Sequence, residues 1–195
     1  WEIRVMLGED WLDANRTEIG FKPKVSVFLD VSILQSHLKA FQQHTHPPSS
    51  PCQECITHLH TASLLYRGDF MSEFNLRDSA NFEDWLFFEQ DTIRREYADA
   101  LKNMTNLLYS VGGFTEGIVF SRRWLALDNY NEEAHRVLMR LYMLTGQRHL
   151  ALRQYQECVR ILQTDLSATP EPMTSALNEA ITSKALNPGE EFSEP

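Results

Sequence analysis

The C-terminal half of the sequence carries one pattern of apolar and small residues twice, 34 residues apart. The matched positions are Leu101, Met104, Leu107, Leu108, Gly112 and Gly117 in the first copy and His135, Leu138, Leu141, Tyr142, Gly146 and Ala151 in the second. In each copy a glycine ends one helical run, and a small residue in the next run lets two helix backbones approach closely. Helix pairs with this period cannot bury their apolar faces alone, so they stack on one another and present a groove.

A third, imperfect copy ends at Tyr66-Arg67-Gly68-Asp69-Phe70 and is separated from the other two by an insertion and a long helix. Three units are normally needed for a stable stack, and the spacing between the copies is the period of tetratricopeptide (TPR) repeats. The sequence therefore predicts an all-α fold of TPR-like stacked antiparallel helix pairs over residues 28–186, with a short β-hairpin remnant at the N-terminus.

The individual helices are predicted from apolar periodicity and from the glycines and prolines that interrupt it. They cover about 30–41, 53–66, 81–111, 115–128, 132–145 and 147–163, with a last helix after Thr169. Thr169 is predicted to cap that last helix, and Pro170 to be its first helical residue. Residues 187–195 are predicted to form a flexible acidic tail.

Residues 1–27 differ from the rest, and we expect them to be the C-terminal fragment of a winged-helix domain. The first residues fit the end of a helix that stops at Gly8. Two short β-prone runs, Trp11-Leu12 and Ile19-Gly20-Phe21, flank a polar turn and predict a small hairpin. Because the chain starts at Trp1 rather than at methionine, we expect it to be a piece of a longer protein, unless a leader was removed.

The net charge of the chain is −9, which disfavours nucleic-acid binding, since such binders present a basic face. The charges are also segregated. Residues 69–96 hold eight acidic residues and three arginines, whereas residues 121–160 hold seven arginines and four acidic residues. Solvated helix faces of opposite sign are the simplest interpretation. DNA binding is expected only through a full-length winged helix, and only weakly or not at all from this chain alone.

No motif of a known enzyme class occurs in the sequence, so we expect no enzymatic activity. No apolar run approaches the length of about 18 residues that a membrane-spanning helix needs, so no membrane association is expected. The chain has three cysteines, an odd and small number, and no signal peptide. These features favour a cytoplasmic protein with reduced thiols.

One short stretch could bind a metal ion. It contains His44, His46, Cys52, Cys55, His58 and His60. Cys52-x2-Cys55 has the spacing of a zinc knuckle, and Cys55 and His58 would share one face of a helix. The simpler interpretation places Cys55 on the buried face of an amphipathic helix and leaves the histidines exposed. Zinc is the less favoured alternative because the ligand pattern is not a recognised one, and a redox role is less favoured still because no βαβ pattern surrounds the cysteines.

The long predicted helix also carries a dense apolar patch formed by Trp85, Phe87 and Phe88. A patch of this kind is most often core. This one wraps more than one face of the helix, so we expect part of it to pack on the N-terminal fragment or on a partner.

Several separate blocks of the sequence are distinctive. They are Gly68-Asp69-Phe70, Phe74 to Leu86, Glu132 to Tyr142, Gly146-Gln147-Arg148, Ala151 to Cys158 and Thr169 to Thr174. Together they resemble the bacterial transcriptional activator domain (BTAD) of SARP-type regulators, over about residues 28–183. The chain departs from that family at Asn129, where a proline is common, and in residues 42–52, which are unusual in their histidines and cysteines.

The resemblance implies a regulatory, protein-interaction domain of a bacterial transcriptional regulator, which mediates oligomerisation, relays a signal or contacts the transcription machinery. It also implies an OmpR-like winged helix before the domain, with residues 1–22 as the end of its recognition helix and its wing. On the TPR register, the partner-binding groove is expected to be lined by Lys102, Asn106, Tyr109, Arg136, Arg140 and Met143. A general TPR scaffold that binds a partner peptide, without a role in transcription, is the alternative.

Overall fold

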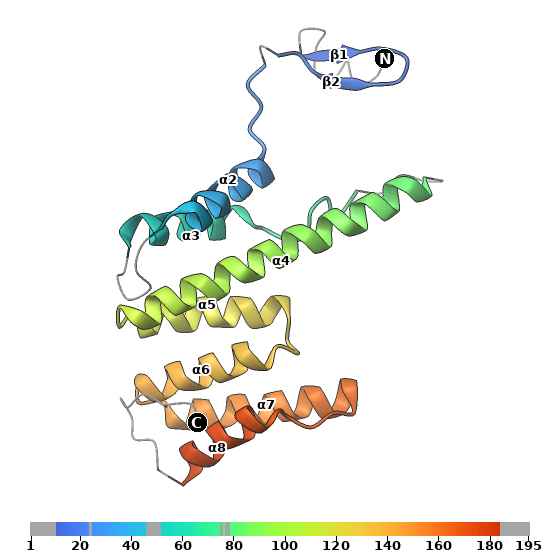
Figure 1. The fold of residues 1–195 in the computed structure, drawn as a ribbon. Helices are drawn as coiled ribbons and strands as arrows, with labels where there is room; N and C mark the ends of the chain where they lie inside the picture. Colours follow the sequence, from blue (N-terminus) through green and yellow to red (C-terminus); the bar gives the residue numbers. More distant parts are fainter. Residues whose placement is uncertain (1–10, 24, 46–51, 75, 77–78, 184–195) are drawn as a thin grey trace. The chain divides into compact units, whose positions relative to one another are not determined.

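The computed structural model describes residues 11–23, 25–45, 52–74, 76 and 79–183 (Figure 1). The chain divides into two compact units, one ending at Asp30 and one beginning at Val31, and each is described by itself. The first unit contains a two-stranded antiparallel sheet, and the second contains the stacked helices. In the described part of the chain, no helix is both long and apolar enough to cross a membrane.

A tight polar turn shapes the hairpin of the first unit. Strand β1 (Leu12–Ala14) pairs with β2 (Ile19–Phe21), with Leu12 opposite Phe21. Between them, the Asn15 side-chain oxygen accepts hydrogen bonds from the backbone N–H groups of Thr17 and Glu18, at 2.8 and 2.9 Å. An asparagine that bonds the backbone ahead of it is a common turn former, so the predicted hairpin is confirmed. The helix predicted to end at Gly8 lies outside the described residues.

The second unit consists of seven helices within its described residues. They are α2 (Asp30–Gln43), α3 (Gln53–Leu65), α4 (Ala80–Ser110), α5 (Phe114–Leu127), α6 (Glu132–Leu144), α7 (Arg148–Leu166) and α8 (Pro172–Thr182). From α3 onward each helix contacts the next one along the chain, and α8 also contacts α6. Figure 1 shows the resulting ladder of helices from α4 to α8. The predicted all-α stack of helix pairs is confirmed.

The two copies of the repeat end their first helices in the same way. Gly112 and Gly146 have φ angles of +76° and +74°, in the left-handed region that glycine adopts most readily. After α4, the N–H of Gly113 donates to the carbonyl of Leu108, and after α6 the N–H of Gln147 donates to that of Tyr142. Both helix ends are therefore Schellman motifs, which satisfy the last carbonyls and turn the chain back.

A third glycine allows close packing between helices. A Cβ added at Gly117 of α5 would lie 3.3 Å from the Cδ2 atom of Leu141 on α6 and 3.8 Å from the Cβ of Leu108 on α4. The glycine therefore lets α5 sit between the two helices at a distance that a larger side chain would widen. Its equivalent in the second repeat, Ala151, is fully buried.

Two apolar cores hold the stack together. The first lies mainly among α2, α3, α4 and α5 and also includes Ala134 of α6, and its large buried members include Leu34, Leu59, Leu101 and Trp124. The second lies among α5, α6, α7 and α8. Its buried members are Ile118, Leu138, Met139, Leu141, Tyr142, Met143, Ala151, Leu177 and Ile181. Because α5 contributes to both cores, the helix pairs form one continuous packed layer.

Polar contacts also connect the first helix pair to the repeats. The Arg123 guanidinium of α5 donates to the carbonyl of Ser63 on α3 and to the hydroxyl of Tyr97 on α4. The Tyr97 ring stacks on that of Tyr66, which caps α3, with ring centroids 4.0 Å apart. Burial raises the pKa of Tyr97, although the nearby Arg123 opposes that change. One arginine therefore links three helices.

The start of α8 differs from the prediction. Glu171 is the N-cap and Pro172 is the first helical residue, so the assignment of these roles to Thr169 and Pro170 is wrong. Both Thr169-Pro170 and Glu171-Pro172 place a proline correctly for a first turn. A tertiary contact favours the second pair, because the Glu132 carboxylate accepts the N–H of Glu171 at 2.9 and 3.1 Å.

Candidate functional site

The predicted groove residues lie on α4 and α6, the first helices of the two repeats. Two of them already form ion pairs with other residues of the stack. Lys102 of α4 donates to the carboxylate of Glu133 on α6 at 2.7 Å. Arg136 of α6 donates to the carboxylate of Glu171 at 2.6 Å and to the Thr174 hydroxyl at 3.0 Å. These two cations therefore connect successive repeats.

The other groove residues differ in their exposure. Asn106 is exposed, whereas Tyr109 is half-buried and packs edge-on against Phe114, with ring centroids 5.9 Å apart. Arg140 is half-buried. Met143 is fully buried in the second core, so its side chain does not face a groove that solvent can reach. The reason is that α6 is contacted by α5, α7 and α8, which cover more of its circumference than the repeat pattern indicates.

Aromatic side chains cluster at the first third of α4 and in the segment before it. We call Phe70, Phe74, Phe82, Trp85, Phe87 and Phe88 the aromatic surface. Trp85 contacts the rings of Phe70 and Phe82, with centroid distances of 6.0 and 5.5 Å. Phe87 and Phe88 are each 66% exposed, and Trp85 is 44% exposed. Phe87 and Phe88 contact each other, with ring centroids 5.7 Å apart. The aromatic surface thus consists of two groups of contacting rings, of which Phe87 and Phe88 are the most exposed to solvent.

Acidic side chains lie near the aromatic surface on α4. Glu83 and Asp84 are exposed on the same third of the helix, whereas Asp91, further along the helix, pairs with Arg95 at 2.7 Å. An apolar surface beside exposed acidic side chains is suited to a partner that offers apolar side chains beside basic ones. The rings of the aromatic surface lie outside both apolar cores of the helical unit.

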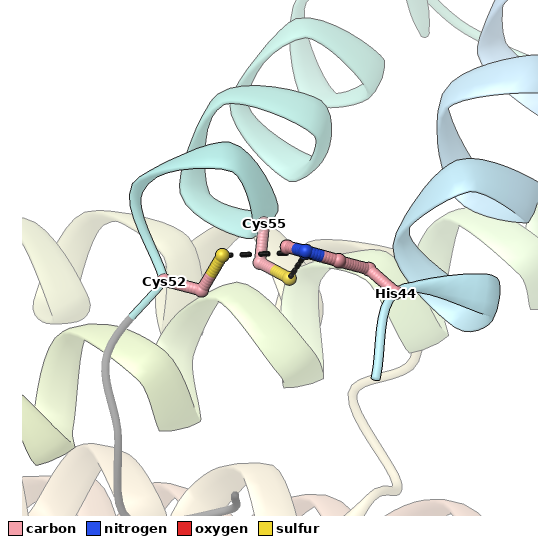
Figure 2. A group of neighbouring side chains, drawn as sticks. All are labelled: His44, Cys52 and Cys55. Carbon is pink, nitrogen blue, oxygen red and sulfur yellow. Dashed lines mark hydrogen bonds between the residues drawn. The ribbon is translucent and has the colours of Figure 1, made fainter. Parts of the chain in front are cut away.

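The structure gathers half of the predicted metal ligands (Figure 2). His44 follows the last residue of α2, Cys52 is the N-cap of α3, and Cys55 lies in the first turn of α3. The Nδ1 atom of His44 is 3.3 Å from the Sγ atom of Cys52 and 3.3 Å from that of Cys55. Cys55 is fully buried, whereas Cys52 and His44 are half-buried.

Within this cluster, burial changes the pKa of Cys55. Burial raises the pKa of the Cys55 thiol to about 11, with a smaller contribution from its hydrogen bond to Cys52. The other ring nitrogen of His44, Nε2, lies 3.4 Å from the Glu54 carboxylate. All three cysteines of the chain are described, and no disulfide joins any two of them.

The remaining predicted ligands lie elsewhere. His58 faces His37 of α2, with the two Nδ1 atoms 2.9 Å apart. His60 is exposed on α3. His46 is outside the described residues. The predicted cluster of six is therefore reduced to three converging side chains in the described part of the chain.

Two residues that the sequence analysis did not single out contribute to these sites. Glu54 lies within the Cys52-x2-Cys55 spacing, and its position between the two cysteines was a signal that could have drawn attention to it. Arg123, which binds both Ser63 and Tyr97, had no such signal. Its partners lie far away in the sequence, so only the folded chain brings them together.

The sequence and the structure of the chain were compared with those of known proteins. The family model of the bacterial transcriptional activator domain matches residues 29–182. A search among curated proteins found no match. The chain is also similar to a solved structure described as Mycobacterium tuberculosis EmbR in complex with a low-affinity phosphopeptide, with a TM-score of 0.62 and 20% sequence identity.

That similarity covers 93% of this chain and 44% of the EmbR chain, so this chain spans less than half of the EmbR structure. At 20% identity the likeness concerns the fold. It agrees with the stack of helix pairs, and the family model covers well over half of the sequence. The chain therefore belongs to the bacterial transcriptional activator domain family.

Proposed function

We propose that this chain is the protein-interaction part of a bacterial transcriptional regulator, and that its aromatic surface binds the partner. The observation that carries the proposal is the exposure of Phe87 and Phe88, each at 66%, beside the half-exposed Trp85. Contiguous exposed aromatic side chains are uncommon on a surface that meets only water, and they are enriched where proteins bind each other.

The size of the surface is relevant to its affinity. Burying the exposed parts of the Phe87 and Phe88 rings would contribute on the order of 5 kcal/mol. Association itself costs roughly 4 to 15 kcal/mol, so these two rings alone do not hold a partner. The proposed interface therefore includes Trp85 and the acidic side chains beside it, which select a partner with basic residues around an apolar centre.

The predicted groove is the less favoured surface. Two of its three cations, Lys102 and Arg136, are already engaged with Glu133 and Glu171. Asn106 remains as an exposed residue on that side, with Tyr109 half-buried beyond it. We retain these two residues as a secondary proposed contact, while the roles in oligomerisation, signal relay and contact with the transcription machinery are all assigned first to the aromatic surface.

The hairpin unit leads to a related proposal. We infer that β1 and β2 are the wing of a winged-helix domain, because so short a strand pair is not stable by itself. DNA recognition then belongs to the longer protein. The helical domain supplies the contact that converts DNA binding into regulation.

A reporter assay tests the proposed function. The whole chain is fused to a DNA-binding domain of known operator, and transcription from a promoter that carries this operator is measured. We expect activation by the wild-type fusion and its loss in Phe87→Ser/Phe88→Ser. Val119→Ser/Leu166→Ser is the matched control, since both of its side chains are 52% exposed on other helices.

The same assay separates the regulator from the scaffold alternative. A fusion that is folded, as judged by circular dichroism, and yet gives no activation in any variant favours a scaffold without a transcription role. Equal activation by wild type and by the Phe87→Ser/Phe88→Ser variant would instead contradict the assignment of the aromatic surface.

A further inference from the structure

We propose that His44, Cys52 and Cys55 form a binding site for a zinc ion that joins the end of α2 to the start of α3. The three side chains come from the two sides of the connection between these helices, and their donor atoms point toward one another (Figure 2). All three donor atoms lie within 4.8 Å of each other.

The distances fit a tetrahedral zinc site. With Zn–S bonds of about 2.3 Å and a Zn–N bond of about 2.0 Å, tetrahedral angles place each sulfur about 3.5 Å from the nitrogen. The two observed Nδ1–Sγ distances are both 3.3 Å. The donors would therefore move apart by a few tenths of an ångström to admit the ion, which a change in side-chain torsion supplies.

Glu54 prepares the histidine for this role. A histidine that binds a metal through one nitrogen commonly donates its other N–H to a carboxylate, which fixes the tautomer and the ring orientation. In this structure Nδ1 of His44 faces the two sulfurs, and Nε2 lies 3.4 Å from Oε2 of Glu54. The carboxylate therefore favours the tautomer with its proton on Nε2, which leaves Nδ1 available as the ligand.

The charge balance is favourable. Zinc binds cysteine as thiolate, so Zn²⁺ binding releases two thiol protons to the solvent and forms two Zn–S bonds. Two thiolates, one neutral imidazole and one Zn²⁺ sum to zero charge. A neutral centre suits a site in which Cys55 is fully buried, because an isolated charge there would be costly.

Three protein ligands leave a fourth coordination position, which is filled by water or by another donor. His44 and Cys52 are half-buried, so this position is reachable from the surface. His58 and His60 are not expected to fill it. The first faces His37, and the second is exposed.

Metal titration of the whole chain tests the proposal. The reduced protein is stripped with a chelator and titrated with Zn²⁺ against a competing chromophoric chelator, and with Co²⁺ as a spectroscopic probe. We expect one zinc per chain with nanomolar affinity, and sulfur-to-cobalt charge-transfer absorption in the near ultraviolet.

Variants assign the ligands. Cys52→Ser and His44→Ala are expected to weaken Zn²⁺ binding at least about 100-fold, and Glu54→Gln about 10-fold, since outer carboxylates affect affinity to that extent. His58→Ala and His60→Ala are the matched controls and should leave stoichiometry and affinity unchanged. Because Cys52 and His44 are half-buried, their loss should leave the fold intact, which circular dichroism verifies.

Less than about 0.2 zinc per chain in the reduced protein would overturn the proposal, since a site of this kind binds tightly. An unchanged affinity in Cys52→Ser would overturn it as well. So would a protein that binds no metal when reduced and links Cys52 to Cys55 on exposure to air, because that pair would be redox-active instead. None of these outcomes bears on the reporter assay, which concerns a different surface.

Discussion

Arg136 of α6 occupies the same position in the second repeat as Lys102 of α4 does in the first, and each side chain binds a carboxylate at the start of a later helix. Lys102 binds Glu133 at 2.7 Å, and Arg136 binds Glu171 at 2.6 Å. Both repeats therefore carry a cation that reaches forward to the following unit. The consequence is that residues expected to bind a partner also fix the spacing of the repeats.

Removing these two cations should have unequal effects on stability. The Arg136 side chain is 11% exposed, whereas that of Lys102 is 38% exposed. We expect Arg136→Ala to lower the free energy of unfolding by about 2 kcal/mol, since it removes charged hydrogen bonds at a mostly buried position. Lys102→Ala should cost at most about 1 kcal/mol. Urea unfolding of both variants measures the difference, and equal losses would contradict this account.

The left-handed turn at the second repeat gives a second prediction. Gly146 has φ of +74°, and a Cβ there would meet no atom within 4 Å, so the cost of Gly146→Ala is one of backbone conformation alone. We expect a loss of about 1 to 2 kcal/mol in the free energy of unfolding. Ser110→Ala, at the exposed end of α4, is the control and should change stability little. A neutral Gly146→Ala variant would show that the turn adopts another conformation.

The link between Arg123 and Tyr97 should stabilise the docking of the first helix pair. Tyr97→Phe removes the hydroxyl that accepts from Arg123 while the ring continues to stack on Tyr66. We expect about 1 to 2 kcal/mol of destabilisation, because the guanidinium loses a partner in a partly buried position. Hydrogen exchange should rise in α3 more than in α7. Uniform exchange across both helices would contradict the local role of the contact.

His135 makes stability sensitive to acid. Its ring is 2% exposed, with Nε2 bonded to the Asn129 carbonyl at 3.0 Å and Nδ1 to the Gln154 amide at 2.7 Å. Burial lowers the pKa of His135 from its ordinary 6.5, although the carbonyl of Asn129 and the carboxylates of Glu132 and Glu157 oppose the change. The unfolded chain then binds a proton that the folded chain does not.

The contribution of His135 to the free energy of unfolding is therefore fully present above pH 6.5, and it is lost as the pH falls through the lowered pKa of the folded state. We expect the free energy of unfolding to decrease between pH 7 and pH 5 less steeply in His135→Gln than in the wild type. His60→Gln, at an exposed position, is the control and should keep the wild-type slope. Parallel profiles for all three proteins would show that His135 is not the group responsible.

DNA binding should be weak for this chain alone. The net charge of −9 repels phosphate, and the proposed wing is a small part of a winged-helix domain. Fluorescence anisotropy with duplex DNA is expected to give no saturable binding below micromolar concentrations at physiological salt. Sub-micromolar binding by residues 1–195 would contradict this expectation.

The features that local sequence determines were predictable. The glycines that follow α4 and α6 end these helices through their own backbone conformation, which does not depend on what packs around them. The turn of the hairpin likewise depends on a local hydrogen bond to Asn15. The helices begin and end within two residues of their predicted limits, except that α7 runs three residues further than predicted, to Leu166. At the start of α8, which comes later than predicted, either of two prolines could occupy the first turn, and the choice between them depends on Glu132, which contacts Glu171 only in the folded stack.

The burial and the neighbours of the site residues depend on how the helices pack, so fewer of them could be predicted from the sequence. Met143 has the register of a groove residue, but α6 is covered from three sides, so the side chain is buried. The convergence of His44 with Cys52 and Cys55 requires the end of α2 and the start of α3 to lie together in the folded chain. By spacing along the chain alone, His58 and His60 are as good candidate metal ligands as His44. In the fold, however, His58 faces His37 and His60 is exposed.

The aromatic surface is proposed to contact a protein partner in transcription. Site-specific photo-crosslinking in cells tests this most directly, with a photoreactive phenylalanine analogue placed at Phe87 and, as the control, at Val119. We expect the probe at Phe87 to crosslink to a component of the transcription machinery or to a second copy of the regulator, and the probe at Val119 to give no such crosslink. Equal crosslinking at both positions, or none at Phe87 in a regulator that still activates transcription, would contradict the proposal.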